Sequence, residues 1–176
     1  MTESIYIFTD GSSRGNPGPG GWGAILIGKF GSFEVKELGG GEAHTTNNRM
    51  ELSAAIRALS FATSQLQNFS TSKLVIYTDS GYLVEGITKW IHNWQKRRWK
   101  TADKKPVLNR DLWEELYGLA DGKKIEWKHI RGHVGVAGNE RCDEIATSFA
   151  DGESPKLYSG VLQNYGIKNI LNVARG

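Results

Sequence analysis

Four acidic residues, Asp10, Glu51, Asp79 and Asp143, stand where carboxylates can act together. Asp10 and Asp79 each end an apolar run, where a strand would finish, whereas Glu51 and Asp143 lie near the starts of helical stretches. Carboxylates at strand ends and helix starts can converge on one edge of a sheet. Four of them together repel one another unless divalent cations neutralise them, so the pattern predicts a site for hard metal ions.

A second feature is a basic segment rich in tryptophan, residues 89–105. It holds seven of the 22 lysines and arginines and one acid, Asp103, and Trp90, Trp94 and Trp99 are interleaved with the cations. One interpretation is a solvated charged face with the tryptophans folded beneath it. Basic groups mixed with flat aromatic surfaces favour a nucleic-acid backbone, which needs both counter-charge and stacking.

The bulk properties indicate one compact domain that needs no disulfide. The chain has 176 residues, 39% of them hydrophobic, and no apolar run reaches the roughly 18 residues that cross a bilayer. The first residues do not form a basic segment followed by an apolar stretch, so we expect a cytoplasmic monomer without membrane association. The single cysteine, Cys142, has helical spacing with Ile145 and Phe149, which predicts a buried core position rather than a reactive thiol.

The pattern of elements that must position the acids is that of an α/β domain with a mixed sheet. The predicted strands are residues 4–10, 22–28, 33–38, 73–78 and 125–130. The predicted helices are residues 48–66, 80–87, 111–120 and 139–150, the last with Asn139 as its N-cap. Residues 11–21 are dense in turn formers. The tail, residues 152–176, can dock on the domain, bind a partner or remain mobile, and docking is the default expectation.

Five motifs in unbroken order resemble those of type 1 ribonuclease H in its bacterial form. They are residues 8–23, 45–52, 77–80, 90–101 and 132–143. The resemblance implies a five-stranded mixed sheet flanked by helices, with the second strand antiparallel to its neighbours. It also implies an endoribonuclease that cuts the RNA strand of RNA–DNA hybrids and leaves 5′-phosphate and 3′-hydroxyl ends. The catalytic domain would be residues 1–151, followed by a tail of unknown role.

The resemblance assigns roles to the acids and to one histidine. Asp10 would bridge two Mg²⁺ ions, for which Mn²⁺ can substitute. Asp143 would help to hold the ion that activates water, and Glu51 and Asp79 the ion on the leaving-group side. His133 would carry protons or ease product release, although an isolated loop histidine is more often a surface residue.

Substrate contacts are likewise implied by the resemblance. The residues concerned are Asn16, Thr46, Asn47, Asn48, Trp90, Trp94, Lys96, Arg97, Arg98 and Lys100. Thr46 and Asn48 would hold a phosphate of the DNA strand at a helix start. Asn16 and Asn47 would face the minor groove, with turn and cap chemistry as the alternative interpretation, and Glu51 would also contact the RNA 2′-hydroxyl.

One departure from the family and two competing functions remain open. Many relatives carry glutamine two residues after the third acid, whereas this chain has Gly81, so one hybrid contact is lost or replaced. A catalytically silent hybrid-binding module is the first alternative, since a fold does not imply activity. A related nuclease or strand-transfer enzyme that acts on DNA is the second.

Overall fold

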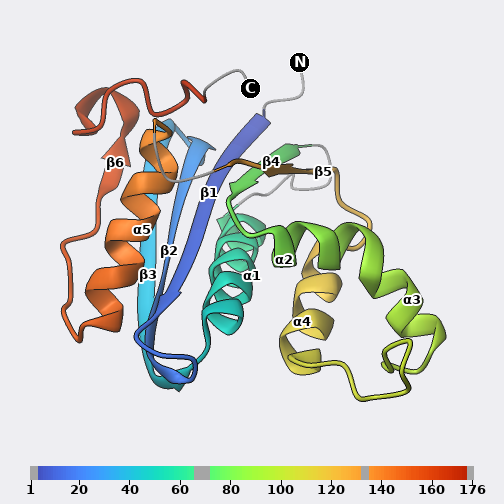
Figure 1. Ribbon diagram of the computed structural model, residues 1–176. Coiled ribbons are helices and arrows are strands. Elements are labelled where there is room, and N and C mark those ends of the chain that lie inside the picture. The colour runs from blue at the N-terminus through green and yellow to red at the C-terminus, as the bar shows by residue number, and fades with distance from the viewer. Residues whose placement is uncertain (1–3, 66–71, 132–134, 174–176) are drawn as a thin grey trace.

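The protein is described by a computed structural model, which defines residues 4–65, 72–131 and 135–173 (Figure 1). The strands are β1 (Ser4–Ser13), β2 (Gly18–Lys29), β3 (Phe33–Thr45), β4 (Lys73–Thr78), β5 (Ile125–His129) and β6 (Ser159–Val161). The helices are α1 (Asn47–Gln65), α2 (Gly81–Glu85), the π-helical turn η1 (Gly86–Trp90), α3 (Ile91–Lys96), α4 (Arg110–Ala120), α5 (Ala137–Ala150) and the 3₁₀ turn η2 (Leu162–Asn164). Within these ranges, no helix combines the length and the apolar character that crossing a membrane requires.

All six strands form one mixed sheet, in the order β5-β4-β1-β2-β3-β6. β1, β4 and β5 run parallel to one another, while β2 is antiparallel to both β1 and β3, as expected. The sixth strand is the difference from the expected five. It comes from the tail, where residues 159–161 pair with residues 34–36 of β3.

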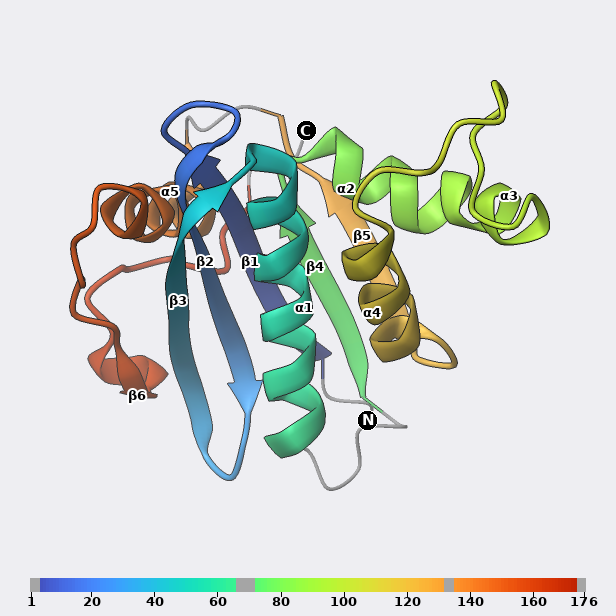
Figure 2. The ribbon, with the colours of Figure 1, turned by 90° about the horizontal axis from the view of Figure 1, so that it is seen from below.

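Helices cover the two faces of the sheet, α1 on one side and α5 on the other (Figures 1 and 2). Side chains alternate between the faces along each strand. Ile5 and Ile7 of β1 pack into the core beneath α1, whereas Phe8 packs with Cys142 of α5 and Tyr165 of the tail. The predicted burial of Cys142 is confirmed, and both strand faces are used for packing.

The glycine-rich segment differs from the prediction. Residues 11–21 were expected to form a turn, but β1 continues to Ser13 and β2 already begins at Gly18. β3 also passes its predicted end at residue 38 and runs through three glycines to Thr45. The reason is helix packing: a Cβ at Gly21 would overlap the Ala146 carbonyl oxygen, and one at Gly39 would lie 2.5 Å from the Phe149 ring. These glycines are strand residues that let α5 approach the sheet.

Two helix boundaries were also predicted wrongly. Helix α5 begins at Ala137, so Asn139 is a buried residue of its first turn and not its N-cap. Asp143 consequently lies in the second turn of the helix. A helix was predicted for residues 80–87. Its α-helical part ends at Glu85, and a π-helical turn follows directly up to Trp90. Residue type alone suggested Asn139 as a cap, but the cap is Val136, three residues earlier, in an extended conformation.

Candidate active site

Three of the four predicted acids converge at the carboxyl end of the central strands. Thr9 of β1 pairs with Thr78 of the parallel strand β4, which places the next residues, Asp10 and Asp79, side by side where this pairing ends. Glu51 reaches the same point from α1. One carboxylate oxygen from each of these three residues lies within 4.8 Å of the others.

A glycine explains how α1 comes close enough for Glu51 to join the cluster. Any Cβ at Gly11 would overlap the backbone of Met50 and Glu51, so the residue after Asp10 must lack a side chain. The Gly11 backbone N–H also donates to Asp10 Oδ1 at 2.8 Å, which fixes that carboxylate. The strand and the helix therefore meet backbone to backbone at the site.

The fourth acid, Asp143, reaches the same cleft from α5, on the opposite face of the sheet. The cleft has a volume of about 430 Å³. Its lining residues are Asp10, Gly11, Ser12, Asn47, Asn48, Glu51, Asp79, Ser80, Gly81, Tyr82 and Asp143. We call this the acidic cleft. Asp143 is half-buried at its wall and does not belong to the tight group of three.

Two of the cleft carboxylates are buried without enough hydrogen-bond donors or positive charges to replace the water they lose. Asp10 is 2% exposed and Glu51 4% exposed. Burial, with the charge of Asp79, raises the pKa of Asp10 to about 7. Burial, with the charges of Asp10 and Asp79, raises the pKa of Glu51 well above its ordinary value. Asp10 Oδ2 and Glu51 Oε2 have no hydrogen-bond partner among the described residues. Unsatisfied buried carboxylate oxygens are the ligand atoms that hard divalent cations require, so the cleft fits such ions.

The start of α1 forms the rim of the acidic cleft. Thr46 Oγ1 accepts from the Arg49 backbone N–H at 3.3 Å, and Asn16 Oδ1 accepts from the Asn47 backbone N–H at 3.1 Å. The cap and turn chemistry considered for this region is therefore present. The exposed residues Asn47 and Asn48 line the cleft.

Sequence reasoning missed two residues that join this rim to the start of α4. Arg49 forms a two-point ion pair with Asp111 of α4, at 3.0 and 2.9 Å. Tyr82 lines the acidic cleft, and its hydroxyl accepts hydrogen bonds from Asn109 Nδ2 and Trp113 Nε1, each at 3.1 Å. Arg49 stands inside a recognised motif and Tyr82 follows Asp79 by one helical turn, so both had a signal in the sequence.

The basic segment extends away from the sheet around α3 (Figure 2). Lys96, Arg97, Arg98 and Lys100 are all exposed. Trp90 is 38% exposed, whereas Trp94 is half-buried, with ring-centroid distances of 5.9 Å to Trp90 and 5.3 Å to Trp113. Trp94 therefore packs against other rings, and Trp90 presents the larger free surface.

The predicted proton carrier, His133, lies outside the described residues. Another histidine, for which no role was predicted, contacts the backbone of a cleft residue. His129 Nε2 is 3.1 Å from the Asp79 backbone oxygen. A Cβ added at Gly81 would stand 4.0 Å from the same nitrogen, so the position of the missing glutamine has room for a side chain.

Comparison with known proteins places this geometry in a family. The family model described as RNase H matches residues 2–151. Ribonuclease H of Thermosynechococcus vestitus is 55% identical over 153 residues, which cover 87% of this chain and 92% of that protein. The crystal structure of LC9-RNase H1, a type 1 RNase H with the type 2 active-site motif, is 32% identical with a TM-score of 0.76, covering 91% of this chain and 79% of that one. LC11-RNase H1 in complex with an RNA/DNA hybrid has a TM-score of 0.63 at 24% identity, covering 84% of this chain and 97% of that one, and shows the shared fold.

Proposed function

Because the chain belongs to the RNase H family, we propose that it is a metal-dependent endoribonuclease that hydrolyses the RNA strand of RNA–DNA hybrids in the acidic cleft. Three carboxylates within 4.8 Å, two of them buried with an unsatisfied oxygen, are the observation that carries this proposal. A protein gains no stability from such a cluster, since each ionised group repels the others. The cluster makes sense as a cation site for phosphodiester cleavage.

Asp10, Glu51, Asp79 and Asp143 would hold the metal ions, and Asp10, at the centre of the cluster, would contact both. Two bound Mg²⁺ ions, or Mn²⁺ as a substitute, would supply an activated water and stabilise charge on the leaving oxygen, which gives 5′-phosphate and 3′-hydroxyl ends. The pKa of about 7 for Asp10 belongs to the metal-free protein, and a cation would favour its ionised form.

The rim at the start of α1 would bind the hybrid backbone. In the described part of the chain, Asn47, Arg49 and Met50 donate their backbone N–H groups to partners, whereas no acceptor is found for that of Asn48. A free N–H at a helix start, with the positive end of the helix dipole, suits a phosphate. Thr46 still has its hydroxyl proton to donate to the same DNA-strand phosphate. The amides of Asn16 and Asn47 would face the minor groove, and Glu51 would contact the RNA 2′-hydroxyl.

The basic segment would hold the DNA strand beyond the cleft. Trp90 offers an exposed ring for a sugar or base, and Trp94 supports it from beneath. Lys96, Arg97, Arg98 and Lys100 would supply counter-charge along the backbone. His133 would carry protons near neutral pH and ease product release. Residues 1–151 would form the catalytic domain of a cytoplasmic monomer that does not associate with membranes, with residues 152–176 as its tail.

A cleavage assay with four labelled substrates tests the proposal. Purified protein with Mg²⁺ is offered RNA–DNA hybrid, double-stranded RNA, single-stranded RNA and duplex DNA. We expect cleavage of the RNA in the hybrid alone, and an Asp10→Asn variant that binds hybrid without cutting it. Binding without cleavage by the unaltered protein would favour the silent module, and cleaved duplex DNA would favour the DNA-directed nuclease.

The basic segment is tested separately by replacing Lys96, Arg97 and Arg98 with alanine. Fewer phosphate contacts release fewer counterions, so the hybrid Kd should rise and its dependence on salt should become shallower. The rate of the bound complex should change little, because these residues lie outside the cleft. An unchanged salt slope would exclude this segment from hybrid binding.

A further inference from the structure

We propose that the ion pair between Glu37 and Arg141, held in place by the C-terminal tail, is a positioning device for Asp143. The inference rests on the proposed function, in which Asp143 helps to hold a metal ion. It assigns to a tail outside the matched family region a part in setting the geometry of the acidic cleft.

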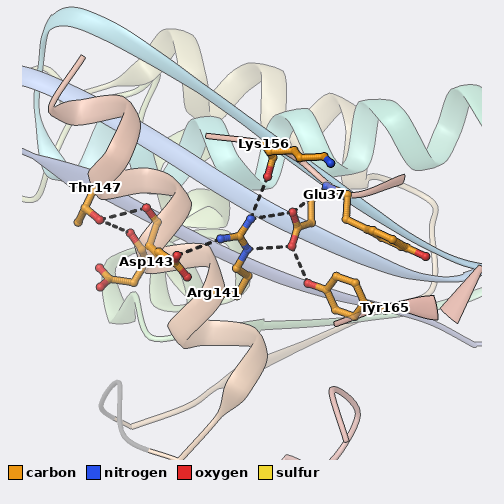
Figure 3. Close-up of polar contacts among 8 residues, drawn as sticks. Glu37, Arg141, Asp143, Thr147, Lys156 and Tyr165 are labelled. Atoms are coloured by element: carbon orange, nitrogen blue, oxygen red, sulfur yellow. Dashed lines mark hydrogen bonds and ion pairs between the residues drawn. The ribbon is translucent and has the colours of Figure 1, made fainter. Parts of the chain in front are cut away.

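The carboxylate of the pair is buried, the Arg141 side chain is 18% exposed, and both groups are hydrogen-bonded (Figure 3). Glu37 of β3 is 2% exposed, and Arg141 of α5 donates to both of its oxygens, at 2.9 and 3.0 Å. Two tail residues complete the set. The Tyr158 backbone N–H donates to Glu37 Oε2 at 2.8 Å, and the Tyr165 hydroxyl donates to Oε1 at 2.6 Å. We call these four residues the Glu37 node.

The tail also holds Arg141 directly. Arg141 Nη2 donates to the Lys156 backbone oxygen at 3.1 Å. Tyr165, which is 3% exposed, packs in the core between α5 and the sheet, and Ile170 joins it there. The strand pairing of β6 with β3 fixes the tail next to Glu37. The tail is thus bound to β3 and α5 at once and connects them.

Helix geometry links this connection to Asp143. Successive residues of an α-helix turn by about 100°, so the two neighbours of a residue project from opposite flanks of the helix. Cys142 is fully buried against the sheet. Arg141 therefore lies on the flank toward β3 and the tail, and Asp143 on the flank toward the acidic cleft. Figure 3 shows this arrangement, with Arg141 directed at Glu37 and Asp143 pointing away from it. Rolling α5 about its axis would move both side chains together.

Part of the sheet surface beneath α5 is formed by glycines, and the other contacts of the helix there are apolar. Glycines at positions 21, 23 and 39 face the helix, and the close contacts there are with helix backbone and with the side chains of Ile145 and Phe149. Glycines allow close approach but present no side chains that interlock with those of the helix. At the far end of α5, Asp151 pairs with Arg14 in an exposed position, where ion pairs contribute little. The Glu37 node is the directional polar contact that fixes the Arg141 flank of α5 to β3 and the tail, and we infer that it sets the roll.

The test compares Tyr165→Phe, which removes one oxygen, and Glu37→Gln, which removes the charge, with Leu116→Ala as control. Leu116 is buried in α4 beneath the opposite face of the sheet, so its loss lowers stability without touching the node. Hybrid cleavage gives kcat and KM per folded molecule, and calorimetry gives the affinity for Mg²⁺ alone. A small displacement of a catalytic group costs rate, so we expect kcat to fall about threefold for Tyr165→Phe and about tenfold for Glu37→Gln. Mg²⁺ affinity should fall with it.

In both node variants the KM for the hybrid should stay constant, because the proposed hybrid contacts lie on other elements. The control variant Leu116→Ala should keep its kcat despite a lower Tm. The inference is overturned if both node variants retain kcat and Mg²⁺ affinity and lose only stability. If Glu37→Gln does not fold, Tyr165→Phe decides alone. An active Asp143→Asn variant would instead refute the proposed role of Asp143 itself, which separates the two failures.

Discussion

The acidic cleft and the Glu37 node treat a buried carboxylate in opposite ways. Glu37 and Asp10 are each 2% exposed. Burial raises the pKa of Glu37, but hydrogen bonds from Arg141, Tyr165 and the Tyr158 backbone outweigh it, so the pKa lies below its ordinary value. Asp10 has one backbone donor and like-charged neighbours, and its pKa rises to about 7.

The difference separates structural from functional charge. Burial removes both carboxylates from water, and only Glu37 gains enough hydrogen bonds and counter-charge within the protein to offset the cost. A chain that surrounds Glu37 with an arginine and two tail contacts is able to satisfy a buried carboxylate. The unsatisfied oxygen of Asp10 is therefore better explained by an external partner. Four measurements can break or sharpen this contrast.

The largest effect is expected from Glu51→Gln in the acidic cleft. Loss of a metal-binding charge should lower kcat on the order of a thousandfold, as for other groups that act as a unit with their neighbours. The metal-free protein should be no less stable, because a neutral amide replaces a carboxylate that is buried and repelled. Hybrid cleavage and thermal unfolding in chelator measure the two quantities. A large loss of stability would make the cleft acids structural and remove the contrast.

The next effect is a loss of stability in the node, from Arg141→Ala. The change leaves Glu37 buried without its counter-charge, which costs about 3 kcal/mol in the free energy of unfolding. Urea denaturation measures it. Lys73→Ala serves as the control, because Lys73 pairs with Glu126 where both side chains are 40% exposed or more, and such pairs contribute less than about 1 kcal/mol. Equal losses in the two variants would show that burial of the Glu37 pair is unimportant.

The two regions should also give the metal-free protein opposite responses to pH. The pKa of Glu37 is lowered on folding, so its contribution to stability is present above the ordinary value of 4.5 and is lost as pH falls through the folded pKa. The pKa of Asp10 is raised from 3.8 to about 7, so the folded state binds the extra proton and loses stability as pH rises between these values. In chelator, Asp10→Asn should raise Tm at pH 8 by several degrees and change it little at pH 4.

Glu37→Gln should show the reverse pattern, with a loss of Tm at pH 8 that shrinks in acid. Thermal melts of both variants at a series of pH values, all in chelator, provide the comparison. Parallel pH profiles for the two variants would contradict the assignment of opposite charge environments.

The smallest effect is expected at the rim of the cleft, from Gly81→Ala. The added methyl group has space and removes chain entropy from the unfolded state, so stability should rise by about 0.5 kcal/mol. Gly23→Ala is the matched change next to α5. Its Cβ would lie 2.6 Å from the Cys142 carbonyl oxygen, so the helix must shift and stability should fall. Urea denaturation of both variants shows whether a methyl group fits at the cleft rim and not beneath α5. A loss of stability in Gly81→Ala would contradict the free space at position 81.

Local pattern was sufficient to predict much of the fold and the three converging acids. The boundaries of β4 were predicted correctly and the start of α1 to within one residue, because apolar periodicity follows directly from burial on one face. The predicted end of α1, residue 66, lies outside the described residues. The strand extensions through the glycines were missed, since the residues that form turns are also those that let a helix approach a sheet. Asp10 and Asp79 could be found because each directly follows a buried run.

The Glu37 node could not be predicted in the same way. Along β3, Glu37 follows Lys36 and takes the inward-facing position two residues after Val35, so the sequence shows a charge on the buried face but not the groups that compensate it. Its partners Arg141 and Tyr165 are 104 and 128 positions away. Only the assembled sheet brings them to it. The same holds for Tyr82 of α2 and Asn109, the residue before α4. The fold brings them into hydrogen-bond contact beside the cleft.

The pairing of β6 with β3 has a consequence for solubility. A bare strand at the border of a sheet exposes unpaired backbone groups onto which a second molecule can add its own strand. At one border of this sheet, Lys128 and Glu126 of β5 place charges where such an addition would begin. At the other, the tail supplies a three-residue strand, and Tyr158 accepts the next backbone N–H, that of Glu37. A proteolytic cut after residue 152 would uncover β3 and leave a protein prone to self-association.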